Sequence, residues 1–124
     1  MIEDPHSTGV QGEEAATRYL KNKGYRIIDR NFRAERFEID IIAKTGNTMV
    51  FCEVKTARSK KFGSPLSWVT PQKARRVALA AHEYIALNEI TGVDFRFDVL
   101  GLFVENDTLS IKHIENAFTA PEDI

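Results

Sequence analysis

The stretch FEIDIIAKTGNTMVFCEVKTARSKK, residues 37–61, constrains the fold of this chain more than any other. Ile, Val and Phe alternate with polar residues on both sides of Gly46-Asn47, a dipeptide suited to a two-residue hairpin turn of type II′. Such a turn pairs Thr45 with Thr48, so the numbers of opposed residues always add to 93. The pattern therefore predicts an antiparallel β-hairpin whose register is set by its turn.

This register places charged side chains opposite one another on one face of the hairpin. Asp40 is expected opposite Glu53, and Glu38 opposite Lys55, with Cβ atoms roughly 4.5–5.5 Å apart. Two carboxylates so close repel by about 3 kcal/mol at an effective dielectric constant near 20. A bound Mg²⁺ or Mn²⁺ ion would offset the repulsion, because hard cations prefer oxygen ligands. Lys55 would then stand beside the metal, where it could orient or polarise an attacking water.

A purely structural interpretation of the same residues remains open. Charged hairpins often face solvent, and Glu38 with Lys55 would then form a cross-strand ion pair. Repulsion between Asp40 and Glu53 would be relieved by the nearby lysine, or by protonation of one carboxyl group. The spacing alone does not choose between a metal site and a solvated face.

The remaining elements predict an α/β domain with the order α-β-β-β-α-β-β. A helix is expected over residues 10–23, capped by Thr8 and ended by Gly24, with Glu13 on its buried side. A second helix is expected over 71–88, with Thr70 as cap and Pro71 in its first turn. Strands are expected at 25–33, 95–104 and 109–118, besides the hairpin. A mixed sheet flanked by helices is the natural packing, in one domain spanning residues 1–124 with flexible ends at 1–8 and 119–124.

Positive charge is concentrated in one part of the chain. The net charge of −1 argues against a general polyanion binder, but no Asp or Glu occurs between positions 54 and 82. That span holds Lys55, Arg58, Lys60, Lys61, Lys73, Arg75 and Arg76. Such asymmetry is expected of a local anion-binding face for nucleic acid, and the alternative is a solvated loop followed by an ordinary basic helix.

Several features exclude other classes. The single cysteine, Cys52, allows no intrachain disulfide and no Cys-rich zinc site, which favours a reducing, cytoplasmic setting. No run of 18 apolar residues occurs and the polar N-terminus is unlike a secretory signal, so no membrane span is expected. His6, His82 and His113 show no zinc-ligand spacing and are interpreted as incidental.

The cysteine, one aspartate and two aromatic residues are expected to act mainly in the structure of the domain. Cys52 is expected in the core. Asp98 is expected to form a salt bridge near Arg96 or with the basic helix, rather than to act in catalysis. Trp68 and Phe62 flank the basic loop, where they would anchor it to the core or stack on an unpaired base.

The motifs together resemble a known family. Asp40, twelve residues, and then Glu53-Val54-Lys55 resemble the signature of the PD-(D/E)XK nucleases. The segments GEEAATRYLKNKGYRIIDRNFR, EIDIIAKTGNTMVFCEVKTARS, FGSP and RFDVLG resemble the YraN-like bacterial family, whose members are predicted endonucleases similar to archaeal Holliday-junction resolvases. This resemblance implies a restriction-endonuclease-like, three-layer fold. It assigns metal binding to Asp40, Glu53 and Glu13, and the catalytic lysine role to Lys55.

The resemblance also suggests supporting residues. Gln72 and Lys73 fall where related nucleases place a helper polar residue on the second helix. Glu38 matches a glutamate typical of the family and is expected to support Lys55. Phe37 departs from the pattern, which usually has glycine there, and a glycine would have allowed close backbone approach to a ligand.

The function expected from these observations is Mg²⁺-dependent hydrolysis of DNA phosphodiester bonds, with branched or damaged DNA among the substrates and a homodimer as one form of the protein. Two alternatives stay open. One is a nucleic-acid-binding module that keeps the fold without turnover, and the other is a protein-interaction scaffold whose carboxylates are solvated.

Overall fold

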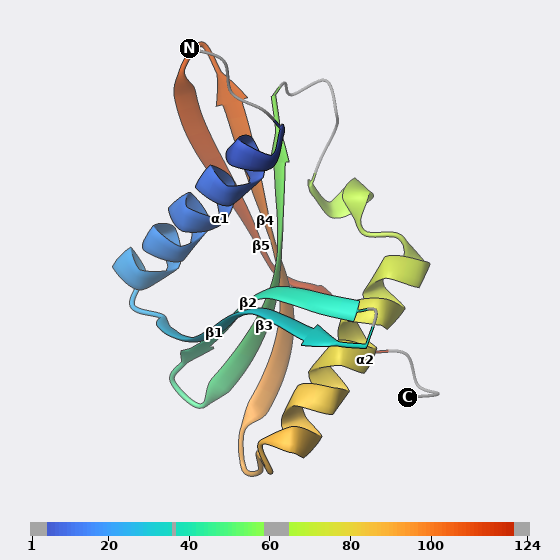
Figure 1. Cartoon of the computed structure of the whole chain (residues 1–124). Helices are drawn as coiled ribbons and strands as arrows, with labels where there is room; N and C mark the ends of the chain where they lie inside the picture. The colour runs from blue at the N-terminus through green and yellow to red at the C-terminus, as the bar shows by residue number, and fades with distance from the viewer. Residues whose placement is uncertain (1–4, 36, 59–64, 121–124) are drawn as a thin grey trace.

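The fold is a five-stranded mixed β-sheet with one long helix on each face (Figure 1). The computed structural model describes residues 5–35, 37–58 and 65–120. Its elements in chain order are α1 (Pro5–Asn22), β1 (Arg26–Ala34), β2 (Phe37–Thr45), β3 (Thr48–Ala57), the 3₁₀ helix η2 (Pro65–Trp68), α2 (Pro71–Leu87), β4 (Asp94–Glu105) and β5 (Thr108–Phe118). The expected order α-β-β-β-α-β-β and the α/β class are confirmed.

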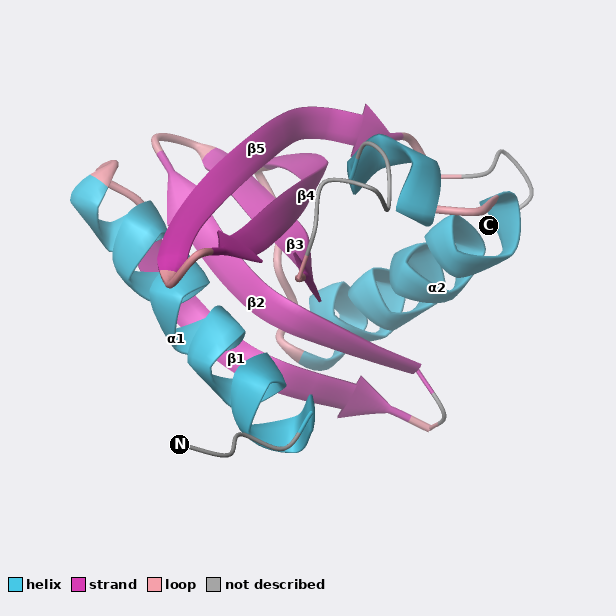
Figure 2. Cartoon of the chain, turned by 90° about the horizontal axis from the view of Figure 1, so that it is seen from above, coloured by secondary structure: helices cyan, strands magenta, loops and turns pink. Residues whose placement is uncertain are grey.

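The strands lie in the spatial order β1-β2-β3-β4-β5. Neighbouring strands are antiparallel except β3 and β4, which are parallel and are joined by the crossover that contains α2. A parallel pair needs such a long connection, whereas antiparallel neighbours are joined by tight turns. The view from above shows α1 and α2 on opposite sides of the sheet, which gives three layers (Figure 2).

Two apolar clusters hold the layers together. One joins α1 to its face of the sheet through residues such as Ala16, Leu20, Ile41 and Leu100. The other joins α2 to the opposite face, around Phe51. Cys52 is fully buried in the α1 cluster, as expected, and burial raises the pKa of its thiol.

The helix ends follow local chemistry, with one correction. Thr70 caps α2, since its hydroxyl oxygen accepts a hydrogen bond from the backbone N–H of Lys73 at 3.1 Å. Gly24, with a φ of +95°, follows the end of α1, as expected. The predicted start of α1 is wrong: the helix begins at Pro5, so Thr8 lies within it and is not its cap. Proline suits a first helical position because it has no N–H to satisfy. Of the ends expected to be flexible, 5–8 is helical, and 1–4 and 121–124 lie outside the described residues.

The hairpin turn forms as predicted. Thr45 pairs with Thr48, and the register with numbers adding to 93 continues to the pair Ile41–Cys52. Gly46 has a φ of +57°, while Asn47 is not among the residues of positive φ, as a type II′ turn requires.

At Gly12 the helix α1 packs closely on β3, and replacement of this glycine provides a test of the packing. A Cβ at this position would press on Oγ1 of Thr56 in β3. We expect Gly12→Ala to lower the free energy of unfolding by about 1–2 kcal/mol, because overpacking outweighs the gain in helix propensity. Urea denaturation measures this. The added substitution Thr56→Ala should restore most of the loss, and equal losses in the single and double variants would contradict the packing argument.

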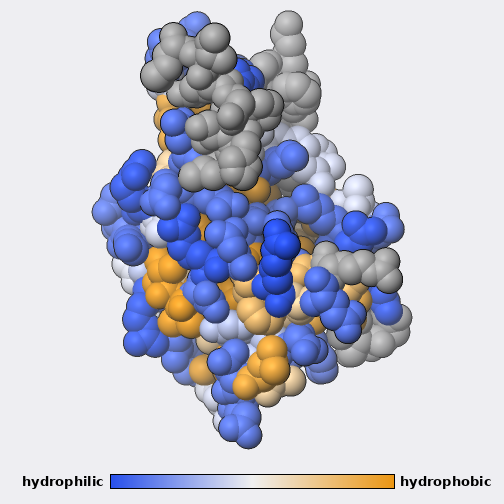
Figure 3. All heavy atoms as spheres, in the orientation of Figure 1, coloured by the Kyte–Doolittle hydropathy of each residue, from blue (hydrophilic) through white to orange (hydrophobic). Residues whose placement is uncertain are grey.

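The surface seen in Figure 3 is mainly hydrophilic, with apolar side chains exposed only in small separate groups. Among the described residues no helix combines the length and the apolar character that crossing a membrane requires.

Candidate metal and nucleic-acid site

The site begins where β2 and β3 separate. Their ladder ends at Ile41–Cys52; beyond it β2 remains paired only with β1, and β3 only with β4 (Figure 1). The expectation that Asp40 lies directly opposite Glu53, and Glu38 opposite Lys55, in a continuous ladder is therefore wrong. Ile39 packs in the cluster under α2 while Ile41 packs under α1, so β2 turns at Asp40 and leaves β3.

Asp40 lies in the gap that this separation opens. Its side chain replaces the missing backbone partner, because Oδ2 accepts a hydrogen bond from the N–H of Val54 at 2.7 Å. Asp40 is only 8% exposed. Burial and the negative charge of Glu53 raise the pKa of Asp40 to about 7, against the opposing effect of the Val54 N–H, and the charges of Glu13 and Glu38 add to the increase.

Glu53 projects toward α2 from the neighbouring strand. Its Oε1 atom lies 2.7 Å from the Nζ atom of Lys73, and its side chain is 14% exposed. Asp40 and Glu53 line one cavity of about 390 Å³, together with Glu38, Gln72, Lys73 and Arg76. The structure therefore brings Asp40 and Glu53 to one site, even though their backbones are not paired.

Lys55 and Glu38 do not form the expected pair. Glu38 faces Arg33 across the β1–β2 ladder, with its Oε2 atom 3.4 Å from Nε of Arg33. This corrects the expected role of Glu38 as a support of Lys55. Lys55 is exposed, and because strand residues alternate it shares the α2 face with Glu53, two positions away.

Glu13 approaches the site from another direction. It lies on α1, which packs on the face of the sheet opposite to α2, and it is half-buried. Its charge still contributes to the raised pKa of Asp40. Within the part of the chain that is described, no three His, Cys, Asp or Glu side chains lie close enough together to hold a metal ion. The three-carboxylate set expected from the resemblance is therefore not a preformed cage.

The six residues expected to bind nucleic acid do not all lie at the cavity. Lys73 and Arg76 line the cavity, as does Gln72. Arg58, which directly follows β3, is exposed, and so is Arg75 on α2. Lys60 and Lys61 lie outside the described residues, as does Phe62.

Asp40 and Glu53 fit a hard divalent cation. Mg²⁺ commonly keeps several waters and is bound by only one or two carboxylates together with substrate phosphates. A nearly buried carboxylate with a raised pKa is a strong candidate for such a ligand, because its charge is costly until a cation neutralises it. Among the described residues no Lys, Arg or His forms an ion pair with Asp40.

A second polar cluster is centred on Asp98. The interpretation of His113 as incidental missed it, because His113 is part of this cluster. Asp98 is fully buried on β4 and accepts hydrogen bonds from Nε and Nη2 of Arg96 at 2.9 and 2.8 Å. Its Oδ2 atom also lies 2.7 Å from Nε2 of His113, and its Oδ1 accepts from the N–H of Asn116 at 3.0 Å. Burial acts to raise the pKa of Asp98, but these bonds outweigh it and hold the pKa below its ordinary value.

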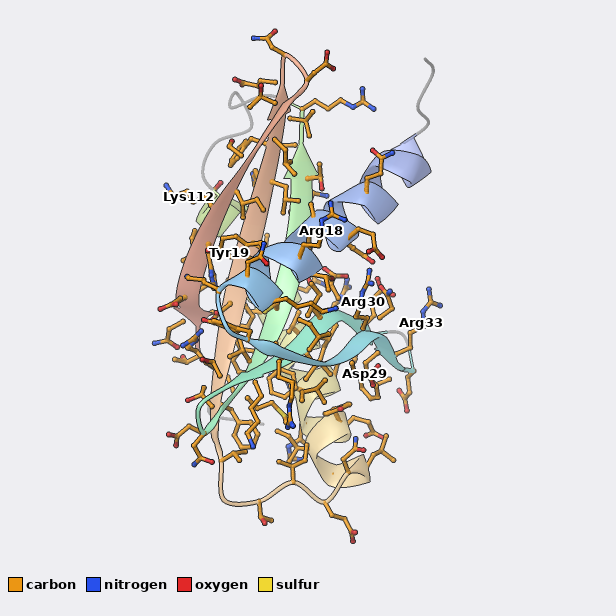
Figure 4. All side chains as sticks on the ribbon, turned by 90° about the vertical axis from the view of Figure 1, so that its left-hand side faces the viewer. Arg18, Tyr19, Asp29, Arg30, Arg33 and Lys112 are labelled. Atoms are coloured by element: carbon orange, nitrogen blue, oxygen red, sulfur yellow. The ribbon has the colours of Figure 1, made fainter. Side chains whose placement is uncertain are left out.

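His113 is therefore structural rather than incidental. Its side chain is 2% exposed, and its Nδ1 atom lies 3.2 Å from the hydroxyl of Tyr19 on α1. Figure 4 shows Tyr19 on α1, and Lys112, the neighbour of His113, on β5. Of the two salt-bridge partners expected for Asp98, the one near Arg96 is confirmed, and the partner is Arg96 itself. Alternating charged residues at 96 and 98 on one strand face were the available signal for this buried cluster.

Trp68 lies on η2 with its ring centroid 5.6 Å from that of Phe103 on β4. Of the two roles left open for Trp68, this contact is the one expected of a residue that anchors the loop to the core.

Comparison with known proteins relates the chain to one family. The model of the "Uncharacterised protein family UPF0102" matches residues 12–102. The chain is 47% identical over 124 residues to a UPF0102 protein of Chlorobium limicola, with 95% of this chain and 96% of the relative covered. It is 46% identical over 112 residues to one of Caldicellulosiruptor saccharolyticus (89% and 95% covered), and 45% over 111 residues to one of Geobacter sulfurreducens (89% and 87% covered). These names state no activity.

Proposed function

The chain belongs to the UPF0102 family, and we propose that it is a divalent-cation-dependent endonuclease that hydrolyses phosphodiester bonds of DNA. The observation that carries the proposal is the buried carboxylate of Asp40 beside Glu53, at the point where β2 and β3 separate. A solvated charged hairpin would leave both carboxylates exposed, whereas Asp40 is almost inaccessible. Perturbed carboxyl groups lining a cavity are typical of functional sites.

The residues at the site suit distinct parts of such a reaction. Asp40 and Glu53 would hold the cation, and Mg²⁺ when bound supplies charge stabilisation to a phosphate and lowers the pKa of a coordinated water. Lys55 would orient the attacking water or neutralise charge that develops on a phosphate oxygen. Gln72 and Arg76, at the start of α2, would contact the DNA backbone near the cleaved bond.

The proposal extends to substrate and setting. Branched or damaged DNA remains our preferred substrate class, and a two-fold-symmetric junction would call for two copies of the chain. A cytoplasmic location agrees with the single, buried thiol of Cys52. The alternative of a binding module without turnover keeps the same cation and DNA contacts, so only a cleavage assay separates it from the enzyme.

Incubation with a panel of DNAs tests the proposal directly. Labelled linear duplex, single-stranded, flap and four-way-junction DNAs, and an RNA duplex, are incubated with Mg²⁺ or Mn²⁺ and analysed on denaturing gels. We expect cleavage of at least one DNA, absent with a chelator. Lys55→Ala should slow it by about 100-fold or more, the usual effect of losing an electrostatic contact to the transition state.

Lys44→Ala is the matched control, because Lys44 lies on β2 near the hairpin turn and away from the gap. Its cleavage rate should equal that of the wild type. Cleavage that survives both Lys55→Ala and Asp40→Asn would point to a contaminating nuclease. Cation binding without cleavage of any substrate would favour the binding module, and absence of cation binding at millimolar concentrations would favour the scaffold.

A further inference from the structure

Lys73 occupies an electrostatically unfavourable place in its helix. It is the third residue of α2 after the cap Thr70, and the first turn of α2 contains no acidic residue. The N-terminus of a helix carries partial positive charge, so a lysine there is disfavoured unless an anion lies nearby. Arg76 follows one turn later on the same cavity wall. The start of α2 therefore gathers more positive charge than the helix itself would favour.

The anion that balances Lys73 is one of the two carboxylates expected to hold the cation. Nζ of Lys73 lies 2.7 Å from Oε1 of Glu53, and the lysine side chain is 38% exposed while Glu53 is largely buried. Lys73 therefore supplies to Glu53 the positive charge that a divalent ion would otherwise supply. Because the lysine side chain is long and partly in solvent, it can leave the carboxylate without unfolding α2.

We propose that Lys73 is a cation-gated positioning residue: its ammonium group neutralises Glu53 in the cation-free protein and is displaced toward the DNA phosphates when a divalent cation binds. This inference rests on the proposed function of the site. Displacement adds the charge of Lys73 to the charges of Arg76 and the α2 N-terminus, which already face the same cavity. Cation binding and DNA binding are thereby coupled through one side chain, and each must strengthen the other.

The first test measures cation binding without DNA. Mn²⁺ is titrated calorimetrically into the wild type and into Lys73→Met, which keeps the apolar stem and removes the charge. Because the competing ammonium is gone, we expect Mn²⁺ to bind about three- to tenfold more tightly to the variant, as suits the loss of one partly buried ion pair. Arg76→Met is the matched control: it removes a positive charge from the same cavity wall, and in the described part of the chain Arg76 makes no ion pair with Glu53. Its effect should be clearly smaller.

The second test measures DNA binding by fluorescence anisotropy, with and without Ca²⁺, an oxygen-binding cation of the same charge. In the absence of cation, Lys73→Met should bind DNA only slightly more weakly than the wild type, because Lys73 is then held against Glu53 and its loss merely leaves the charge of Glu53 unneutralised. With Ca²⁺ it should bind several-fold more weakly and with a shallower dependence on salt. Arg76→Met should be weaker under both conditions, and Lys73→Arg should restore the cation-dependent gain. A merely structural lysine would not produce this conditional effect.

The outcomes separate the two proposals. Equal Mn²⁺ affinities in the wild type, Lys73→Met and Arg76→Met would contradict the proposed displacement of Lys73 while leaving the cation site in place. Weaker Mn²⁺ binding by Lys73→Met would contradict the displacement as well, because the lysine would then support cation binding. If the wild type binds no Mn²⁺, the proposed function and the proposed displacement of Lys73 are both wrong.

Discussion

The Asp40→Asn variant is expected to be more stable than the wild type at pH 8 when a chelator removes divalent cations. Asp40 is nearly buried, and burial together with the charge of Glu53 raises its pKa to about 7. Ionisation above that pH therefore costs free energy in the folded chain that it does not cost in the unfolded chain. Asparagine avoids this cost and still offers an oxygen to the N–H of Val54.

The sign of the pH dependence follows from the direction of the shift. The ordinary pKa of Asp40 is 3.8, so between that value and about 7 the folded chain binds a proton that the unfolded chain has lost. The contribution of Asp40 to the stability of the wild type therefore falls as pH rises through this window and stays low above it. One pKa unit corresponds to about 1.4 kcal/mol, so we expect Asp40→Asn to gain about 2–4 kcal/mol in unfolding free energy at pH 8. The gain should shrink toward zero near pH 4.

Urea denaturation at pH 4, 6 and 8 measures this effect, and added Mn²⁺ should reverse it. A cation that binds only the folded wild type stabilises it by mass action, while Asp40→Asn has lost a ligand. Glu38→Gln is the control, since Glu38 lines the same cavity but is exposed; the free energy of unfolding of this variant should change by about 0.5 kcal/mol or less. If Asp40→Asn were less stable than the wild type at pH 8, Asp40 would not carry an uncompensated charge.

The largest loss of stability is expected from Asp98→Ala. The carboxylate of Asp98 is fully buried and is the common partner of Arg96, His113 and the Asn116 N–H. Its removal leaves the buried His113 ring and the Asn116 N–H without this acceptor, while Arg96 keeps its hydrogen bond to the Tyr25 hydroxyl but loses the buried charge that it faces. We expect the free energy of unfolding to fall by about 3–5 kcal/mol, the cost of breaking a buried ion pair on one side.

The polar cluster around Asp98 also holds the last part of β5 against β4. Asn116 has a φ of +52° and lies where the β4–β5 register shifts, and its N–H is held by Asp98. Beyond this irregularity Phe118 stacks on Phe97, with ring centroids 5.0 Å apart. Loss of Asp98 should therefore also release the end of β5, which hydrogen exchange would detect as faster exchange near Asn116.

Chemical denaturation at pH 7 tests the Asp98 prediction, with Asp98→Asn as the milder comparison because it keeps one oxygen acceptor. The pKa of Asp98 is held below its ordinary value, so its stabilising contribution is present above pH 3.8 and declines in more acidic solution. The difference between the wild type and Asp98→Ala should accordingly be constant at neutral pH and narrow in acid. A change below about 0.5 kcal/mol would contradict a central role for Asp98.

Family membership and most elements could be predicted because they depend on local patterns. The resemblance to the YraN-like family is supported by the match to UPF0102 over residues 12–102, while the nuclease activity stays a proposal. Thr70-Pro71 begins α2 as expected, because a cap and a first-turn proline need only their neighbours. The start of α1 was misplaced because Thr8 and Pro5 are both good helix starts and propensity alone does not rank them.

The amino-acid sequence by itself determined the alternation of faces along β3 and the register of the hairpin near Gly46, since two-residue turns and strand pleating act over a few residues. Only the tertiary structure decided where that register ends, because the separation of β2 from β3 arises from the pairing of each with its other neighbour in a twisted sheet. The partners of Glu53 and Asp98 were decided there too. Lys73 is distant in sequence from Glu53, and His113 from Asp98. Only the packing of α2 brings Lys73 to Glu53, and only the pairing of β5 with β4 brings His113 to Asp98.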